Sequence, residues 1–214
     1  ALQEAGMILC VHGEDADAPS LKREKVFIDG AMKEIIRCFP RLRVVLEHIT
    51  TRKAVEFIRR APDNVAATIT VHHLFLTIDD VIGGKLEPHH FCKPIAKTSR
   101  DRHALRRAAM SGNQKFFLGT DSAPHDKMHK ECDMGAAGIF TAPVALPLLV
   151  GLFEKYNRLD QLEEFISING ARFYGLPLNE SKITLIKKSW EVPDIYDGYL
   201  IPFKAGHQLA WQVK

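Results

Sequence analysis

The sequence is poor in cysteine and has no long apolar run. The cysteines lie far apart, at positions 10, 38, 92 and 132, without a C-x-x-C pair, which argues against a zinc ribbon or a disulfide framework. The longest apolar stretch, residues 144–153, is short for a membrane span and contains Pro147. The N-terminus lacks the basic segment of an export signal. We therefore expect a cytoplasmic protein with reduced thiols and no membrane association.

An excess of charge of one sign is also missing. Lysine and arginine number 29 against 26 aspartate and glutamate, a formal net charge of +3. The basic residues are scattered, which is typical of solvated helix faces and predicts no nucleic-acid partner. With 214 residues, 46% of them hydrophobic and 26% charged, the chain has the composition of a globular protein with a sizeable core.

Short apolar runs alternate with segments of helical spacing. We expect buried strands at residues 7–14, 42–51, 65–74 and 115–121. We expect helices at residues 20–39, with Ser20 as cap, at 52–60, from Ser99 to a stop at Gly112, at 142–155 and at 160–174. The tail from 181 reads as extended, with candidate strands at 192–203 and 207–214. Because helices between the strands act as crossovers, the pattern predicts an α/β fold with a parallel sheet.

Three of the predicted strands end in a side chain that can bind a metal: His12, His48 and Asp121. Functional sites in parallel α/β folds lie at the carboxyl ends of strands, and alternation along each strand places these residues on one rim. A single histidine there is more often structural, and Asp121 alone could begin a turn or cap a helix. Together, the imidazoles and the carboxylate favour a site for zinc or a similar divalent ion.

Several stretches, in this order, resemble the dihydroorotases of the amidohydrolase superfamily, in particular the single-function type of bacteria and plants. They are LCVHGE, VVLEHITT, ATITVHHL, PHHFCKP, FFLGTDSAPH and NGARFYGLP, and the resemblance runs along essentially the whole chain. It implies a (β/α)8 barrel enzyme with two zinc ions, bridged by a carbamylated lysine and a hydroxide. It also implies the interconversion of dihydroorotate and N-carbamoyl-aspartate in pyrimidine biosynthesis.

The resemblance assigns a role to individual residues of this chain. His12 and His48 match the histidine ligands of the second metal, and Asp121 matches the carboxylate that binds the first metal and acts as general base. Three further positions match contacts to the substrate: His125 through its side chain, and Ala137 and Lys93 through the backbone. Metal-bound histidines need an acceptor for their other ring N–H. Glu14 and Glu47 are candidates, although Glu47 is expected to point away from His48.

The sequence departs from the family pattern in lacking a His-x-His pair and a lysine ahead of His12. The adjacent pairs His72/His73 and His89/His90 are expected to point to opposite faces of a strand and cannot replace it. A βα unit takes about 30 residues and a complete barrel about 250. We therefore expect the C-terminal half of a barrel, strands five to eight, over residues 1–175, with a C-terminal extension over 176–214.

These departures determine what we expect of the isolated chain. It should bind at most about one zinc ion and be inactive by itself, whereas an intact enzyme would bind two zinc ions, act on a small-molecule substrate and form a homodimer. One alternative is a non-catalytic half-barrel that assembles with a partner. Another is a related metal-dependent hydrolase, such as one that acts on hydantoins.

Overall fold

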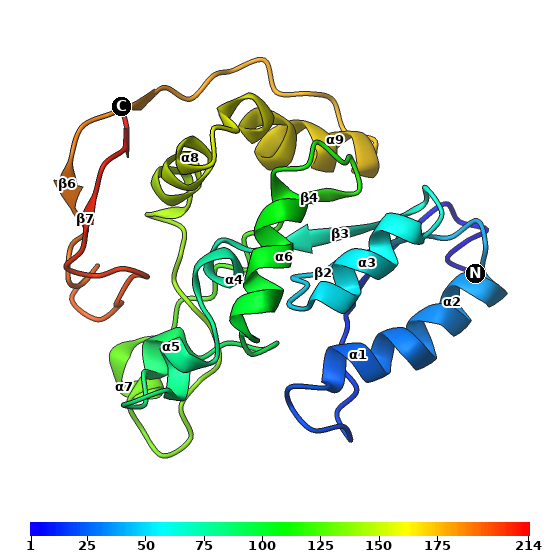
Figure 1. Ribbon diagram of the computed structural model, residues 1–214, viewed down its shortest axis with the longest axis horizontal. Helices are drawn as coiled ribbons and strands as arrows, with labels where there is room; N and C mark the ends of the chain where they lie inside the picture. Colours follow the sequence, from blue (N-terminus) through cyan, green and yellow to red (C-terminus); the bar gives the residue numbers. More distant parts are fainter.

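The computed structural model describes residues 1–214 and contains a four-stranded parallel sheet (Figure 1). Its strands are β1 (Ile8–His12), β2 (Arg43–Glu47), β3 (Val65–Ile69) and β4 (Phe116–Leu118). They lie side by side in the order of the chain, and each neighbouring pair is parallel. The predicted α/β fold is therefore confirmed, although every strand is shorter than predicted.

The helices that connect the strands cover one face of the sheet. The connections between strands contain α1 (Arg23–Phe27), η1 (Ile28–Met32), α2 (Lys33–Cys38), α3 (Arg52–Arg60), α4 (Val71–Phe75), α5 (Asp79–Ile82), η2 (Pro88–His90) and α6 (Ser99–Ala109). After β4 follow α7 (Lys127–Lys130), α8 (Ala145–Lys155), η3 (Leu159–Gln161), η4 (Glu164–Ile168) and α9 (Asn169–Tyr174). Figure 1 shows α3 and α6 next to each other in front of the sheet.

Threonine caps set the beginnings of α3 and α6, as another does for α4, whereas the predicted cap at Ser20 is wrong. The side chain of Thr51 caps α3, and that of Thr98 caps α6 as part of a capping box. The first helix begins only at Arg23 and has no side-chain cap. The reason is a turn before it, in which the backbone N–H of Lys22 donates to the carbonyl oxygen of Pro19 (2.6 Å).

The predicted strand at residues 65–74 ends early because Thr70 begins a helical turn. The Thr70 hydroxyl accepts a hydrogen bond from the backbone N–H of His73 (3.2 Å), so the chain enters α4 directly after β3. His72 and His73 therefore lie on a helical turn rather than on a strand. The rule that placed them on opposite faces does not apply, and their ring centroids are 4.5 Å apart.

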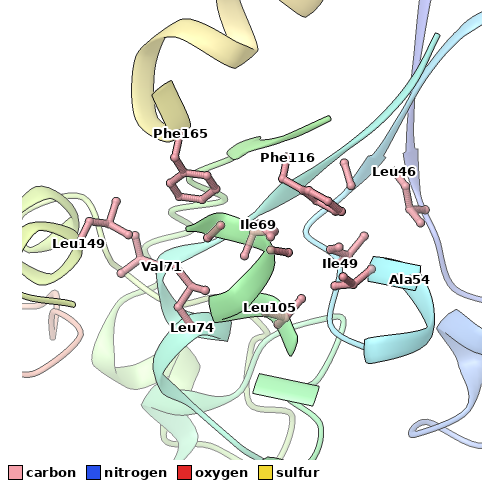
Figure 2. Packing of buried hydrophobic residues seen from close by; sticks show 14 of the residues in the cluster. Leu46, Ile49, Ala54, Ile69, Val71, Leu74, Leu105, Phe116, Leu149 and Phe165 are labelled. Atoms are coloured by element: carbon pink, nitrogen blue, oxygen red, sulfur yellow. The ribbon is translucent and has the colours of Figure 1, made fainter. Parts of the chain in front are cut away.

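The main hydrophobic core lies between the sheet and the helices that cover it (Figure 2). Val44, Leu46 and Ile69 enter it from the strands and are at most 1% exposed. The opposite face of the sheet carries a smaller cluster of buried side chains: Val45, Ala66 and Phe117, packed by Phe173 and Tyr174 of α9. Burial on both faces explains why β2, β3 and β4 read as continuous apolar runs.

The C-terminal segment forms two small antiparallel sheets. β5 (Leu185–Ile186) pairs with β8 (Gln212–Val213), and β6 (Trp190–Glu191) pairs with β7 (Gln208–Leu209). The candidate strand at 207–214 is thus confirmed in part, but the one at 192–203 is wrong. That segment contains Pro193 and Pro202, which cannot donate to a ladder, and a turn with positive φ at Asp197 and Gly198. The predicted boundary between barrel and extension near residue 175 stays a prediction.

The most apolar segment of the chain lies inside the protein. Residues 144–153 form most of α8, and Leu149 and Phe153 are fully buried. No helix of the structure has both the length and the apolar character needed to cross a membrane.

Candidate metal-binding rim

Of the three predicted ligands, only His12 lies within its strand. His48 follows β2 by one residue and Asp121 follows β4 by three. Val44 and Leu46, expected on the same face as His48, pack under the helices instead. The backbone at His48 has a φ of 40°, in the left-handed region, and this turn redirects the imidazole toward His12. The alternation argument was therefore correct for His12 and wrong for His48.

His12 and His48 face each other with ring nitrogens in close approach. His12 Nδ1 lies 3.2 Å from His48 Nε2, and the ring centroids are 4.9 Å apart in an edge-to-face arrangement. Two histidine nitrogens bound to one tetrahedral zinc ion at about 2.0–2.1 Å would lie about 3.3 Å from each other. The observed separation therefore fits a shared divalent cation.

Glu14 orients the imidazole of His12. The Oε2 atom of Glu14 lies 3.1 Å from His12 Nε2, and the Glu14 side chain is only 8% exposed. A carboxylate accepts, so Nε2 carries the ring proton and Nδ1 presents its lone pair to the rim. The prediction that Glu14 can accept a hydrogen bond from the other ring nitrogen of His12 is therefore confirmed.

His48 is a neutral imidazole with an unused nitrogen. Burial lowers the pKa of His48, and the neighbouring His12 lowers it further. The Nδ1 atom of His48 is buried and has no hydrogen-bond partner. A neutral ring has a single N–H, and because His12 Nδ1 can only accept, His48 Nε2 carries that proton in the 3.2 Å contact. With the proton on Nδ1 instead, Nε2 offers a lone pair, and the donor set of the pair then suits a metal such as zinc.

Thr68 fixes the turn that presents His48. Its hydroxyl accepts a hydrogen bond from the backbone N–H of His48 (2.6 Å) and donates one to Glu47 Oε2 (2.6 Å). Glu47 also accepts from the Tyr174 hydroxyl (3.5 Å). The Glu47 carboxylate is thus engaged away from the His48 ring, as predicted.

Asp121 follows β4 at the same edge of the sheet, but its carboxylate does not lie within 4.8 Å of both imidazoles, and it accepts no hydrogen bond. Its backbone has a φ of 39° and its side chain is exposed. Partial burial of the carboxylate raises the pKa of Asp121, and the nearby His12 opposes this shift. The alternative that Asp121 caps a helix is wrong, because Asp126 caps α7 by accepting from His129 N (2.9 Å). The free carboxylate remains available to a metal or a substrate.

A second group of possible ligands, His72, His73 and Cys92, is buried behind the rim, with ligand atoms within 4.8 Å of one another. The nitrogens of His73 are already engaged by Thr70 Oγ1 (2.8 Å) and the Pro94 carbonyl (2.9 Å). Because a carbonyl only accepts, His73 Nε2 carries a proton and offers no lone pair. Burial also raises the pKa of Cys92 to about 12, so its thiol is neutral. These bonds make the group a poorer metal site than the rim.

His72 differs from its neighbours in having no partner at all. Both of its ring nitrogens are buried without a hydrogen bond, and the residue is 0% exposed. Burial, assisted by His48, lowers the pKa of His72 to about 3, so the ring is neutral. Such an unpaired buried group costs stability.

The predicted substrate-contacting positions lie close to one another in two loops. His125 Nε2 donates to the carbonyl oxygen of Ala137 (3.1 Å), and Gly138 N donates to the carbonyl oxygen of Phe91 (2.9 Å). The second bond joins the loop of Ala137 to the loop of Lys93. The backbone N–H groups of Ala137 and Lys93 donate no hydrogen bond within the chain. They are therefore free to bind a ligand.

Lys130, which the sequence analysis did not select, holds these loops together. Its Nζ donates to the carbonyl oxygens of Phe91 (3.0 Å), Ala136 (2.8 Å) and Gly138 (2.7 Å). The residue is 3% exposed, and burial lowers the pKa of its ammonium to about 8. A lysine in a polar stretch looks like a surface residue in the sequence, so no local signal marks it.

Glu24 was also missed, and it supports the turn after His48. The carboxylate is 2% exposed and accepts from the backbone N–H and the hydroxyl of both Thr50 and Thr51. In the sequence, Glu24 looks like one more charged residue on an amphipathic helix. Only the packing of α1 against α3 shows its role.

Comparison with known proteins shows which family the chain is similar to. The profile of the amidohydrolase family matches residues 2–190. The dihydroorotase of Shewanella sp. (strain ANA-3) is 50% identical over 219 residues, which cover 100% of this chain and 64% of that protein. The chain therefore spans less than two thirds of the length of such curated relatives.

Solved structures agree with the sequence comparison. The dihydroorotase of Campylobacter jejuni superposes with a TM-score of 0.91 at 43% identity, covering 100% of this chain and 63% of that one. The Saccharomyces cerevisiae dihydroorotase in complex with 5-fluoroorotic acid gives a TM-score of 0.89 at 38% identity, covering 100% and 64%. A D-hydantoinase from Thermus sp. gives 0.78 at 15% identity, covering 99% and 55%, which shows the fold alone.

Proposed function

Because the chain belongs to the amidohydrolase family, we propose that it forms part of a dihydroorotase, which interconverts dihydroorotate and N-carbamoyl-aspartate in pyrimidine biosynthesis. The observation that carries the proposal is the pair of imidazole nitrogens, His12 Nδ1 and His48 Nε2, held 3.2 Å apart. Glu14 holds the other nitrogen of His12, so the His12 lone pair faces the rim, and His48 adds a second lone pair when its ring carries the proton on Nδ1.

The metal and Asp121 have separate tasks in the proposed reaction. Zinc at His12 and His48 would supply Lewis acidity, which polarises the ring amide and lowers the pKa of water. Asp121 takes the proton from the attacking water and delivers it to the leaving ring nitrogen, so one carboxylate serves as base and then as acid. The raised pKa of Asp121 suits a group that must both accept and release a proton.

The loop residues orient the substrate in this proposal. The unpaired backbone N–H groups of Ala137 and Lys93 bind the ring and its carboxylate, and His125 contributes to the carboxylate site. Holding the substrate by its carboxylate positions the scissile amide over the metal, which lowers the entropic part of the barrier.

The intact active site needs more than this chain in the proposal. We assign the four strands to positions five to eight of a (β/α)8 barrel, and the inner face of β1, with Cys10 and His12 exposed, supports that assignment. The intact enzyme would hold two zinc ions and form a cytoplasmic homodimer. The isolated chain would bind at most about one zinc ion and show negligible turnover.

The test uses a protein that contains this chain together with the remaining length of its relatives. Asp121→Ala should abolish hydrolysis of dihydroorotate while the far-ultraviolet circular dichroism stays unchanged. Glu180→Ala, which removes an exposed carboxylate away from the rim, should retain full activity. Turnover of Asp121→Ala within about tenfold of the parent would reject the assignment of Asp121 as base.

A substrate panel separates a dihydroorotase from a hydantoinase-type hydrolase. Dihydrouracil has the same ring without the carboxylate, so the parent protein should strongly prefer dihydroorotate. His125→Ala should weaken the binding of dihydroorotate and leave any activity on dihydrouracil unchanged. Equal losses on both substrates would argue against a carboxylate contact.

A further inference from the structure

A pocket rich in arginine lies on the outer, helical side of the protein, away from the histidine rim. It has a volume of about 350 Å³ and is lined by residues from three separate elements, α3, α6 and the segment after α8. Five of its eight lining residues are basic: Arg59, His103, Arg106, Arg107 and Arg158. No aspartate or glutamate lines it. This concentration of charge contrasts with the weak net charge of +3 for the whole chain.

The pocket lies at the opposite end of the sheet from the proposed active site. Arg59 is in the last turn of α3, ahead of β3, and Arg106 and Arg107 are in the last turn of α6, ahead of β4. His12 and His48, by contrast, follow the carboxyl ends of their strands. An occupant of this pocket therefore does not contact the rim, and its binding can be tested independently of the proposed function.

Most of the guanidinium groups have no counterion in the structure. Arg59 and Arg107 are exposed and form neither a salt bridge nor a side-chain hydrogen bond. Arg106 is held in place because its Nε donates to the Leu74 carbonyl oxygen (2.7 Å), which leaves its two terminal amino groups free. Arg158 has one acidic neighbour, Asp160, at 3.6 Å.

The ordinary explanation for such residues is the helix dipole, and it accounts for part of the pattern. Basic side chains in the last turn of a helix are stabilising, because the C-terminal end of a helix carries about half a negative charge. Three helix ends, of α3, α6 and α8, cannot neutralise four guanidinium groups, even with the carboxylate of Asp160 included. The dipole also does not explain why the arginines line one hollow. The remaining positive charge lacks a partner within the chain.

We propose that this pocket binds a small phosphorylated anion, such as a nucleoside monophosphate. Guanidinium groups match phosphate oxygens with paired, charge-assisted hydrogen bonds, and Arg106 is already fixed in position. Ser111 adds a hydroxyl, and Tyr156 and Met110 add apolar surface beside the charges. The volume suits a small ligand rather than a folded partner.

The test is a calorimetric titration of the chain with adenosine 5′-monophosphate, inorganic phosphate and adenosine at low salt. We expect saturable binding of the monophosphate and of phosphate, weakened by added salt, and no binding of adenosine. Comparable affinity for both anions would show that the pocket recognises the phosphate group alone. Tighter binding of the monophosphate would show that the pocket recognises the phosphate ester.

Matched variants separate this pocket from general surface charge. Arg59→Gln and Arg107→Gln should each weaken phosphate binding by about fivefold or more. Arg60→Gln and Arg100→Gln, which remove exposed arginines of the same helices that do not line the pocket, should stay within about twofold. Equal losses in both sets, or no saturation with either anion at about 10 mM, would overturn the proposal. Binding of a single-stranded RNA without binding of the small anions would also overturn it.

Discussion

Replacing Glu24 by alanine should destabilise the chain by about 4 kcal/mol. The carboxylate accepts four hydrogen bonds, from the backbone N–H and the hydroxyl of Thr50 and of Thr51. The hydroxyls can rotate toward other acceptors when the carboxylate is removed, but the two backbone N–H groups cannot. Each buried N–H that loses its acceptor costs about 1–3 kcal/mol, so the pair costs about 2–6 kcal/mol.

Urea unfolding and thermal unfolding of the parent chain and of Glu24→Ala measure this loss. For a chain of this size, 1 kcal/mol corresponds to about 2–4 °C, so the midpoint should fall by about 10 °C. The control is Glu34→Ala, which removes an exposed carboxylate on the same helical segment that pairs only with Arg37 and Cys38. Its effect should stay within about 0.5 kcal/mol.

The same change should also loosen the turn that presents His48, since Thr50 and Thr51 follow it by two and three residues. Glu24→Ala should therefore weaken zinc binding in addition to lowering stability. If Glu24→Ala unfolds within about 1 kcal/mol of the parent, the hydrogen bonds do not anchor this turn, and the reasoning is refuted.

Three further changes test single contacts. Burial lowers the pKa of Lys130 to about 8 from 10.5, so between these pH values this side chain binds more protons in the unfolded chain, and its contribution to stability should rise by about 3 kcal/mol. The raised pKa of Cys92 acts in the opposite direction in both proteins, so the contribution should appear as the difference between the urea unfolding series of the parent and of Lys130→Met. His72→Leu removes two unpaired buried nitrogens and should leave stability unchanged or raise it by about 1 kcal/mol, whereas a loss above about 2 kcal/mol would indicate a hidden partner. Glu14→Gln should weaken zinc binding about tenfold in competition with a chelator, and unchanged affinity would contradict its role in orienting His12.

The strand pattern carried most of the information about the fold. Apolar runs separated by helical spacing predicted a parallel α/β sheet, and β1 to β4 confirm it. Lengths were less well predicted, because local competition decides them. At Thr70, a hydroxyl that can cap a helical turn outweighed the continuation of β3, and the sequence pattern did not reveal this competition.

The rim was predictable as a set of residues but not in its geometry. Alternation along β1 places His12 correctly, whereas His48 and Asp121 reach the rim through positive φ angles of 40° and 39°. Residues other than glycine seldom adopt such angles, and at His48 the hydrogen bond from its backbone N–H to Thr68 holds the conformation. Contacts across 20 residues of sequence leave no periodic signal.

Support from distant residues was the least predictable part of the site. Lys130 reaches a carbonyl 39 residues away, and Glu24 reaches amides 26 and 27 residues away. Charged residues of this kind look solvent-exposed in a single sequence, because burial of a charge is rare and depends on partners that only the folded chain brings together.

The most direct test of the metal-binding rim is a titration of the isolated chain with Co²⁺, followed by visible absorption. We predict binding of about one equivalent that is lost in His48→Ala, retained in His72→Ala, and free of a thiolate charge-transfer band, because His12, His48 and Asp121 offer only nitrogen and oxygen ligands. Binding that survives His48→Ala and shows a charge-transfer band abolished by Cys92→Ser would place the metal at His72, His73 and Cys92 and contradict the assignment.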